Sequence, residues 1–183
     1  MKIVYWPHHA LLEPTYGVHL PNTHWLEELI ETMHKLTVDY KGIGLACNQL
    51  GIKEKLFIIN CEGRKEYFIN PQIIKHSDDK VSKVEGCLSY PGIEVKTTRS
   101  SKVVVKWQDL EGTTKEEEFS DLKAICVQHE IDHLNGNSII DFLSPLKRKL
   151  TLEKFTKLKK KFERRIKNVE KRHTEESKPV ESS

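Results

Sequence analysis

The sequence has 183 residues, 37% of them hydrophobic and 31% charged, which suits one domain with its own hydrophobic core. It contains no run of the roughly 18–20 apolar residues that a membrane-spanning helix needs, which excludes an integral membrane protein. The first 20 residues have neither the apolar centre of a signal peptide nor the Arg-rich, acid-poor composition of a transit peptide. We therefore expect a cytoplasmic protein whose four cysteines stay reduced and serve as core residues or metal ligands.

Positive charge is concentrated near the C-terminus. Between Lys147 and Arg172 there are 13 Lys/Arg and 3 Glu, a net charge of +10, whereas residues 1–146 carry −5 and residues 173–183 carry −2. This division predicts an acidic domain over 1–146, a basic helix over 147–172 and a disordered tail over 173–183. The basic helix indicates an anionic partner, but a solvated Lys-rich face explains the charge equally well.

The first predicted element is an amphipathic helix over residues 21–40. Asn22 or Thr23 stands at its N-cap position, and residues 41–44 end it. Apolar residues recur at helical spacing along it, namely Trp25, Leu26, Leu29, Ile30, Met33 and Leu36.

Short runs rich in β-branched and aromatic residues follow. They cover residues 56–60, 67–69, 72–75, 81–84, 102–107 and 113–119. Turn residues separate them, among them Asn70-Pro71, Pro91-Gly92 and Glu111-Gly112. This pattern predicts antiparallel strands and hairpins and not a βαβ alternation.

Two further helices are predicted after the strands. Ser120 can cap a helix over 121–135 that ends at Gly136, and this helix is apolar on nearly every side, which predicts that it is buried. A long helix begins after Pro145 and runs to about Arg172. Its narrow apolar stripe consists of Phe155, Leu158, Phe162, Ile166 and Val169. The elements together predict an α+β fold with antiparallel β-sheets packed around a central buried helix, an N-terminal helix and a long C-terminal helix.

The central helix carries a metal-binding motif. His129 and His133 are four residues apart and therefore lie on one helical face, and Glu130 on the adjacent flank is placed to take a proton from a metal-bound water. With nine histidines in the chain, the H-E-x-x-H pattern can arise by chance. Two imidazoles on a buried helix need partners, however, because an unsatisfied buried polar group costs about 1–3 kcal/mol. We therefore predict that His129 and His133 bind a metal.

A catalytic metal needs a third protein ligand, and the candidates separate three hypotheses. The metzincin pattern fails because Ile139 stands where the third histidine belongs. A thermolysin-like peptidase would use Glu153, which lies among lysines and is better explained as an ion-pair partner. Upstream, Cys87 follows a predicted strand and Gly86, where a thiolate can approach a metal and complete a Cys/His/His site with one open position.

Three segments together resemble the peptide deformylase family: residues 42–49 (GIGLACNQ), 85–89 (EGCLS) and 128–136 (QHEIDHLNG). They occur in the family's order and at about its spacing, and the resemblance covers roughly residues 20–145. Cys47 departs from the family's usual small alanine, and Pro7-His8-His9 is a loose version of the family's N-terminal segment. The chain is most similar to the shorter, Gram-negative-style class with a helical C-terminus.

The resemblance implies a hydrolase that removes the formyl group from the N-terminal formylmethionine of new polypeptides and releases formate. It implies that Cys87, His129 and His133 hold the metal and that Glu130 acts as general base and then general acid. It further implies that the Leu88 backbone N–H and the Gln49 side-chain amide stabilise the oxyanion.

The resemblance also implies a substrate site. Gly44 and Gly86 would bring backbone beside an extended peptide, and Ile43, Ile125 and Cys126 would line a slot for methionine. From the sequence alone, core packing explains these last three residues better. A charge cluster that orients the metal ligands is implied for Glu85, Arg99 and Asp132.

The expected metal is Fe²⁺, with Zn²⁺, Ni²⁺ or Co²⁺ as replacements. The expected partners are N-formylmethionyl nascent peptides and the ribosome near its exit tunnel, which the basic helix would contact through rRNA phosphates. Two alternatives stay open: a zinc endopeptidase that uses Glu153, and a ribosome- or RNA-binding module with a structural metal. The second needs a fourth protein ligand, and the sequence near the motif offers no convincing one.

Overall fold

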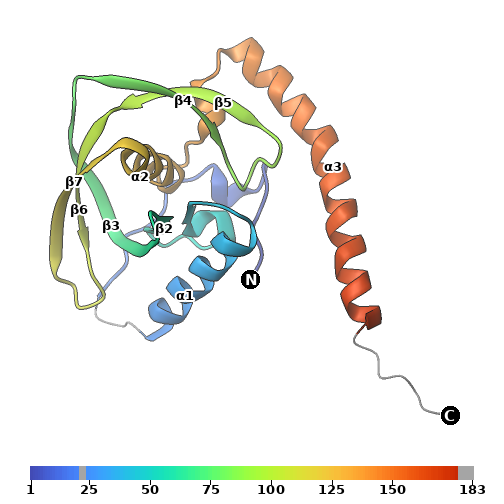
Figure 1. Ribbon diagram of the computed structural model, residues 1–183, viewed down its shortest axis with the longest axis horizontal. Helices are drawn as coiled ribbons and strands as arrows, with labels where there is room; N and C mark the ends of the chain where they lie inside the picture. The colour runs from blue at the N-terminus through green and yellow to red at the C-terminus, as the bar shows by residue number, and fades with distance from the viewer. Residues whose placement is uncertain (21–23, 177–183) are drawn as a thin grey trace.

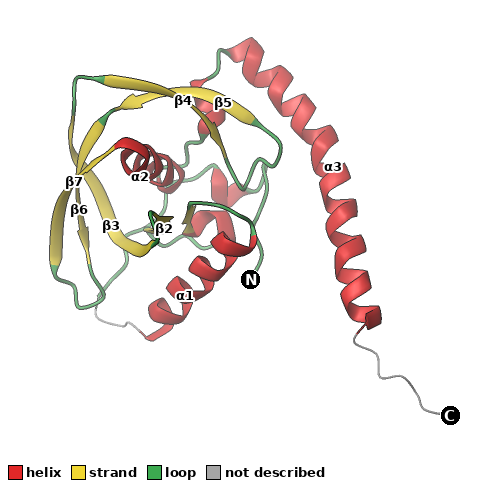
Figure 2. Cartoon of the chain, viewed as in Figure 1, coloured by secondary structure: helices red, strands yellow, loops and turns green. Residues whose placement is uncertain are grey.

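The computed structural model describes the backbone of residues 1–20 and 24–176 and the side chains up to Lys160 within those ranges. The elements are labelled in Figure 1 and coloured by type in Figure 2. The helices are η1 (His9–Leu11), α1 (His24–Asp39), η2 (Cys47–Leu50), α2 (Asp121–Leu134), η3 (Ile139–Phe142) and α3 (Pro145–Glu176). The strands are β1 (Gly44–Ala46), β2 (Leu56–Cys61), β3 (Arg64–His76), β4 (Lys80–Gly86), β5 (Glu94–Ser100), β6 (Lys102–Gln108) and β7 (Thr114–Ser120).

The strands form two antiparallel sheets. The larger has the order β1-β2-β3-β6-β7, and β4 pairs with β5 in a two-stranded sheet. Helix α2 lies between them, with contacts to strands of both (Figure 1). This arrangement confirms the predicted α+β fold with a central helix.

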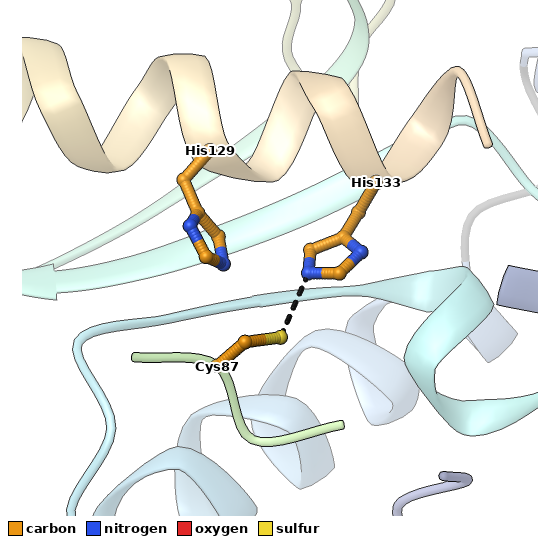
Figure 3. A group of neighbouring side chains, drawn as sticks. All are labelled: Cys87, His129 and His133. Carbon is orange, nitrogen blue, oxygen red and sulfur yellow. Dashed lines mark hydrogen bonds between the residues drawn. The ribbon is translucent and has the colours of Figure 1, made fainter. Parts of the chain in front are cut away.

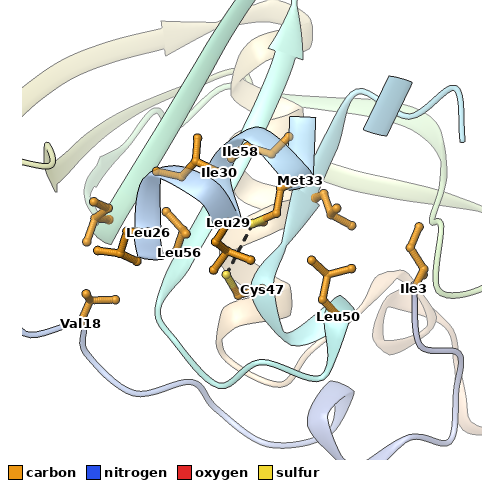
Figure 4. Close-up of a cluster of buried hydrophobic side chains, with 12 residues drawn as sticks. Ile3, Val18, Leu26, Leu29, Ile30, Met33, Cys47, Leu50, Leu56 and Ile58 are labelled. Atoms are coloured by element: carbon orange, nitrogen blue, oxygen red, sulfur yellow. Dashed lines mark hydrogen bonds between the residues drawn. The ribbon is translucent and has the colours of Figure 1, made fainter. Parts of the chain in front are cut away.

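Strand β2 is buried on both faces. Its residues Leu56 and Ile58 join a cluster with α1, which Figure 4 shows, whereas Phe57 and Ile59 point to the opposite face and pack with α2. Successive side chains of a strand point to opposite faces, so a strand between two helices must be apolar at every position. This explains the unbroken apolar run in the sequence.

Two predictions about the strands were wrong. Asn70-Pro71 is not a turn: β3 runs through it, with a register shift between Ile69 and Gln72 and a φ of 52° at Asn70. Asn tolerates this left-handed conformation, and the shift is a β-bulge within one strand. The other error was to miss β5 and the short β1. Strand β5 buries the polar side chains of Thr97 and Arg99, so it lacks the usual apolar alternation.

The three long helices lie where the sequence predicts them, and some details differ. The predicted N-cap residues of α1 lie outside the described residues. Ser120 precedes α2 as predicted, but its hydroxyl donates to the Asp121 carboxylate and does not cap the backbone. Gly136 ends α2 with a φ of 77°. The buried residues of α2 lie on nearly every side of the helix, as expected.

Helix α3 packs against the rest of the protein through its N-terminal half. Phe155 is fully buried there, with its ring 5.5 Å from that of Tyr90 and 6.4 Å from that of Trp6. Farther on, α3 extends along the outside of the body (Figure 1) and continues to Glu176, beyond the predicted end. The structure does not describe the side chains of the rest of the predicted apolar stripe, from Phe162 on, nor residues 177–183. Within residues 1–20 and 24–176, no helix has the length and hydrophobicity to cross a membrane.

The packing of α3 leads to a prediction about stability. Phe155→Ala is expected to lower the free energy of unfolding by about 3–5 kcal/mol, because it removes a buried ring and leaves a cavity. Leu150→Ala is the control on the same helix: its side chain is 55% exposed, and we expect a change within about 0.5 kcal/mol. Urea denaturation followed by circular dichroism measures both. Equal effects of the two substitutions would contradict the role of Phe155.

Candidate metal centre and pocket

Three side chains converge beside α2. Cys87 lies in the turn after β4, and His129 and His133 lie one turn apart on α2, so that their ligand atoms are all within 4.8 Å of one another (Figure 3). The Sγ atom of Cys87 is 3.0 Å from Nε2 of His133. The fold thus brings together Cys87 and His133, which are 46 residues apart along the sequence.

This donor set suits a divalent transition metal. One thiolate and two imidazoles match the ligands that zinc and iron take in proteins, and they leave a coordination position open. Burial lowers the pKa of His133 well below its usual range, so its ring is neutral, as a metal ligand must be. Within the described residues, no other group of three or more His, Cys, Asp or Glu side chains could hold a metal.

The ring of His129 is oriented by a carboxylate. Its Nδ1 lies 2.8 Å from Oε2 of Glu85, the penultimate residue of strand β4 and two residues before Cys87. A histidine that donates from Nδ1 presents Nε2 on its other side, and such carboxylate partners typically orient metal ligands. The geometry therefore directs Nε2 of His129 toward the other two ligand atoms.

Glu85 belongs to a buried charge cluster. Arg99 donates two hydrogen bonds to Glu85 and a third, of 2.8 Å, to Asp132. Thr97 donates a further hydrogen bond to Glu85. Burial raises the pKa of Glu85, but the hydrogen bonds from His129, Arg99 and Thr97 outweigh this and lower it to about 2. The Glu85 carboxylate therefore stays ionised at neutral pH.

Glu130 differs from Glu85, because one of its buried carboxyl oxygens has no partner; Nδ1 of His133 is likewise unpartnered among the described residues. The side chain of Glu130 is 3% exposed, and its Oε2 has no hydrogen-bond partner among the described residues. Burial raises the pKa of Glu130 to about 7, against the opposing charges of His129 and Arg99. A carboxyl group with this pKa both accepts and donates protons near neutral pH.

Gly44 makes room for this carboxyl group. A Cβ atom at this position would lie 2.3 Å from Oε1 of Glu130 and 3.0 Å from Sγ of Cys126. Real Cβ atoms essentially never approach other heavy atoms so closely. Residue 44 must therefore lack a side chain for Glu130 to occupy its place.

Gln49 and Leu88 lie on the cysteine side of the site. The Oε1 atom of Gln49 accepts a hydrogen bond from the Ala46 N–H at 2.8 Å, which fixes the direction of its amide. Its Nε2 lies 3.2 Å from Oγ of Ser89 and 3.6 Å from Sγ of Cys87. No acceptor for the backbone N–H of Leu88 is found within the described part of the chain.

These residues border a pocket of about 1080 Å³. Its lining includes every residue predicted to bind substrate, together with Cys87, Leu88, His129 and Glu130; the five predicted residues are Ile43, Gly44, Gly86, Ile125 and Cys126. His133 and Gln49 are almost completely buried and are not part of the lining. The pocket thus places an apolar slot next to the three ligand atoms.

Sequence reasoning assigned no role to three residues that the site uses. Thr97 bonds to Glu85, Ser89 bonds to Gln49, and Asn48 donates its side-chain amide to the His133 carbonyl. Thr97 is two residues from Arg99, so recognising β5 as a strand would have placed both on one face. Ser89 and Asn48 lie within the quoted motifs, but their contacts cross between elements and leave no local pattern.

The two alternative metal sites are not formed. Ile139, which stands where a metzincin would have its third histidine, is buried and apolar. Glu153 is exposed on α3 and borders a separate hollow beside Trp6 and Arg148. The structure therefore offers no support for the peptidase site that uses Glu153.

Comparison with known proteins agrees with this geometry. The model of the polypeptide deformylase family matches residues 1–149. The peptide deformylase of Hydrogenovibrio crunogenus is 41% identical over 161 residues, which cover 86% of this chain and 94% of the relative. That of Stenotrophomonas maltophilia strain R551-3 is 39% identical over 137 residues, covering 73% of this chain and 80% of the relative.

Solved structures give the same result. The crystal structure of a peptide deformylase from Legionella pneumophila superposes with a TM-score of 0.82 at 36% identity, covering 89% of this chain and 97% of that one. A peptide deformylase from Plasmodium falciparum gives a TM-score of 0.80 at 31% identity, covering 88% and 97%. The match over most of the chain, in both sequence and fold, establishes that this chain belongs to the polypeptide deformylase family.

Proposed function

We propose that the pocket beside α2 is where this chain hydrolyses the N-formyl group of formylmethionyl peptides, with the roles given below. As a polypeptide deformylase, the chain is a metal-dependent hydrolase that acts on the N-terminal methionine of nascent polypeptides and releases formate. The observation that carries the assignment of roles is the buried carboxyl group of Glu130, whose unpartnered oxygen lies beside a Cys/His/His group.

In this proposal Cys87, His129 and His133 hold the metal, which we propose to be Fe²⁺, with Zn²⁺, Ni²⁺ or Co²⁺ as replacements. A divalent ion held there would supply Lewis-acid chemistry: it would lower the pKa of a water and polarise a carbonyl group. The protein contributes the orientation of the ligands: Glu85 holds the ring of His129, and Arg99 and Thr97 hold Glu85.

Glu130 transfers the proton. It takes a proton from the attacking water and passes it to the nitrogen of the leaving amine, as general base and then general acid. Its pKa of about 7 suits both steps, because the group is neither a strong acid nor fully protonated at neutral pH. Its place on the flank of α2, between the two ligand histidines in sequence, keeps it beside the reacting atoms.

Gln49 and Leu88 stabilise the negative charge that develops on the formyl oxygen. The Gln49 amide already points its Nε2 toward Cys87, because Oε1 is held by Ala46. The Leu88 N–H lies in the turn next to Cys87 and is without an acceptor in the described chain. Two fixed donors on one side of the site support an oxyanion hole.

The substrate peptide lies beside Gly44 in this proposal. The Ile43 carbonyl accepts a hydrogen bond of 2.6 Å from the Asn60 N–H on β2. Backbone groups alternate in direction along a strand, so the N–H and C=O of Gly44 point to the other edge of β1. Strand β1 is the last strand at one end of the five-stranded sheet, so within the described chain this edge has no strand partner. An extended peptide can therefore pair with it.

Gly86 borders the same pocket from β4, and Ile43, Ile125 and Cys126 supply apolar surface for the methionine side chain. These three apolar residues support an apolar side chain at the first position of the substrate.

We further propose that the chain works in the cytoplasm and meets its substrates at the ribosome near the exit tunnel. In this view residues 1–146 form the catalytic domain and residues 147–172 a basic helix that contacts rRNA phosphates; of the predicted tail over 173–183, the first four residues continue α3. The net charge of +10 between Lys147 and Arg172 supports this contact. Exposed lysines on the described part of α3, such as Lys154 and Lys157, are available for it.

The proton-transfer role predicts a specific loss of activity. Glu130→Gln is expected to lower formate release from formyl-Met-Ala-Ser about 10²–10⁴-fold, because the amide accepts no proton, while metal content stays near one ion per chain. Both quantities are measured on anaerobically purified protein, and the identity of the metal tests the assignment of Fe²⁺.

The matched control for this substitution is Glu153→Gln, which should keep full activity because Glu153 is exposed on α3. Loss of metal in Glu153→Gln, or full activity in Glu130→Gln, would contradict the assigned roles.

Gly44 leads to a steric prediction. Gly44→Ala is expected to lower activity about 10²-fold or more, because the added methyl group would displace the Glu130 carboxyl. Gly42→Ala should lose much less: its Cβ would lie 2.9 Å from Cδ1 of Leu88, the free end of a flexible side chain. Steady-state kinetics on both variants, with metal content, test this difference. Similar losses in both would show that Glu130 does not depend on Gly44.

The ribosome contact is tested by removing charge and not by deleting α3, because Phe155 belongs to the core. Lys154→Gln with Lys157→Gln should weaken cosedimentation with ribosomes and reduce the salt dependence, by about one unit of slope for each lysine that contacts phosphate. The same change at Lys75 and Lys96, exposed lysines of the body, is the control. Unchanged binding in the α3 double variant would argue against this contact.

A further inference from the structure

Asn48 is a fully buried polar residue that the proposed mechanism does not use. It lies in η2, the short helix that also carries Gln49, and it donates its side-chain amide to the backbone carbonyl of His133. The acceptor belongs to a proposed metal ligand at the last turn of α2. The hydrogen bond thus joins two segments that are 85 residues apart along the chain.

The other half of the same amide has no partner. Oδ1 of Asn48 is buried and has no hydrogen-bond donor among the described residues. Burying an unsatisfied acceptor costs free energy, and a leucine of similar size would avoid that cost. Packing alone therefore does not explain an asparagine here, whereas its bond to His133 does.

Adjacent side chains of η2 hold two parts of the site. Asn48 binds the His133 carbonyl, and Gln49 reaches Ser89 and Cys87 with its Nε2. Because the two residues are consecutive in one tight turn, neither can shift without the other. The bond of Asn48 to His133 thus joins the backbone of Gln49 to α2, while the bond to Ala46 fixes the direction of the Gln49 amide.

We propose that Asn48 is a positioning residue of the metal centre: through the His133 carbonyl it holds η2, and with it Gln49, in place against the helix that carries both imidazoles. The inference rests on the proposed function of this site. It concerns the arrangement of the metal ligands and of the oxyanion donor. The side chain of Asn48 makes no hydrogen bond to the residues proposed to line the methionine slot.

The test uses the full-length protein loaded with Co²⁺, whose visible absorption reports the ligands and the geometry of the centre. Asn48→Leu removes the donor at similar volume, and Asn48→Ala removes it without adding bulk, in case the leucine variant does not fold. We expect both to shift the cobalt absorption bands, to weaken Co²⁺ binding about 10–100-fold in a chelator competition, and to lower kcat with KM for formyl-Met-Ala-Ser within about threefold.

The matched control is Thr37→Val. Thr37 is also fully buried and also donates to a backbone carbonyl, that of Met33 at 2.8 Å, but it lies in α1. It should lower thermal stability and leave the cobalt spectrum unchanged. An unchanged spectrum and kcat in the Asn48 variants, or the same spectral shift in Thr37→Val, would overturn the proposal.

The proposed reaction is tested separately by the unmodified protein. If it bound Co²⁺ with the absorption of a thiolate ligand but released no formate, the proposed roles in catalysis would fail. The effect of Asn48 on the cobalt spectrum would then still decide whether it positions the centre.

Discussion

Burial of α2 is the constraint on which the rest of the structure depends. A helix enclosed by two sheets is stable when it is apolar, and every polar side chain on it must find a partner inside the protein. His129 finds Glu85, and the backbone of His133 finds Asn48. Glu130 is left with an unpartnered oxygen. Nδ1 of His133 is also without a partner among the described residues, so both buried atoms that the helix leaves unsatisfied belong to the proposed site.

The charge cluster follows from the same constraint. Arg99 is 5% exposed and lies between two carboxylates, Glu85 and Asp132, so this group of three carries one net negative charge. A buried ion pair is rarely a large source of stability, because desolvation offsets much of the attraction. Its value here is geometric, because it fixes the carboxylate that holds the ring of His129.

The sequence was sufficient for some features and not for others. Helix α2 was predictable because it is apolar on nearly every side and because His129 and His133 are four residues apart, which places them on one helical face. Cys87 was a candidate from its place after a strand and a glycine, whereas Gln49 and Leu88 were found through a family resemblance, because no local rule connects them with helix α2. Strand β5 was missed because Val95 is its only buried apolar residue: Thr97 and Arg99 on the same face are polar, and they bond to Glu85, which holds a proposed metal ligand.

The steric role of Gly44 was beyond sequence reasoning for a related reason. The sequence suggests a glycine that lets backbone approach a peptide, but the nearest atoms to its absent side chain belong to Glu130, on another element. Such a requirement exists only once β1 and α2 are packed together. The bulge at Asn70 is a similar case. The pair Asn70-Pro71 suits a turn as well as a bulge, and the neighbouring strands decide which of them forms.

The position of α2 in the chain also has a consequence for biosynthesis. It packs against the inner face of the large sheet, which includes Phe57, Phe68 and Val103, yet it is made after every strand of that sheet. While the chain is being synthesised, this face has no cover until residue 134 has left the ribosome. The body therefore cannot fold strand by strand into stable intermediates, and fragments that stop short of α2 expose an apolar sheet that promotes aggregation.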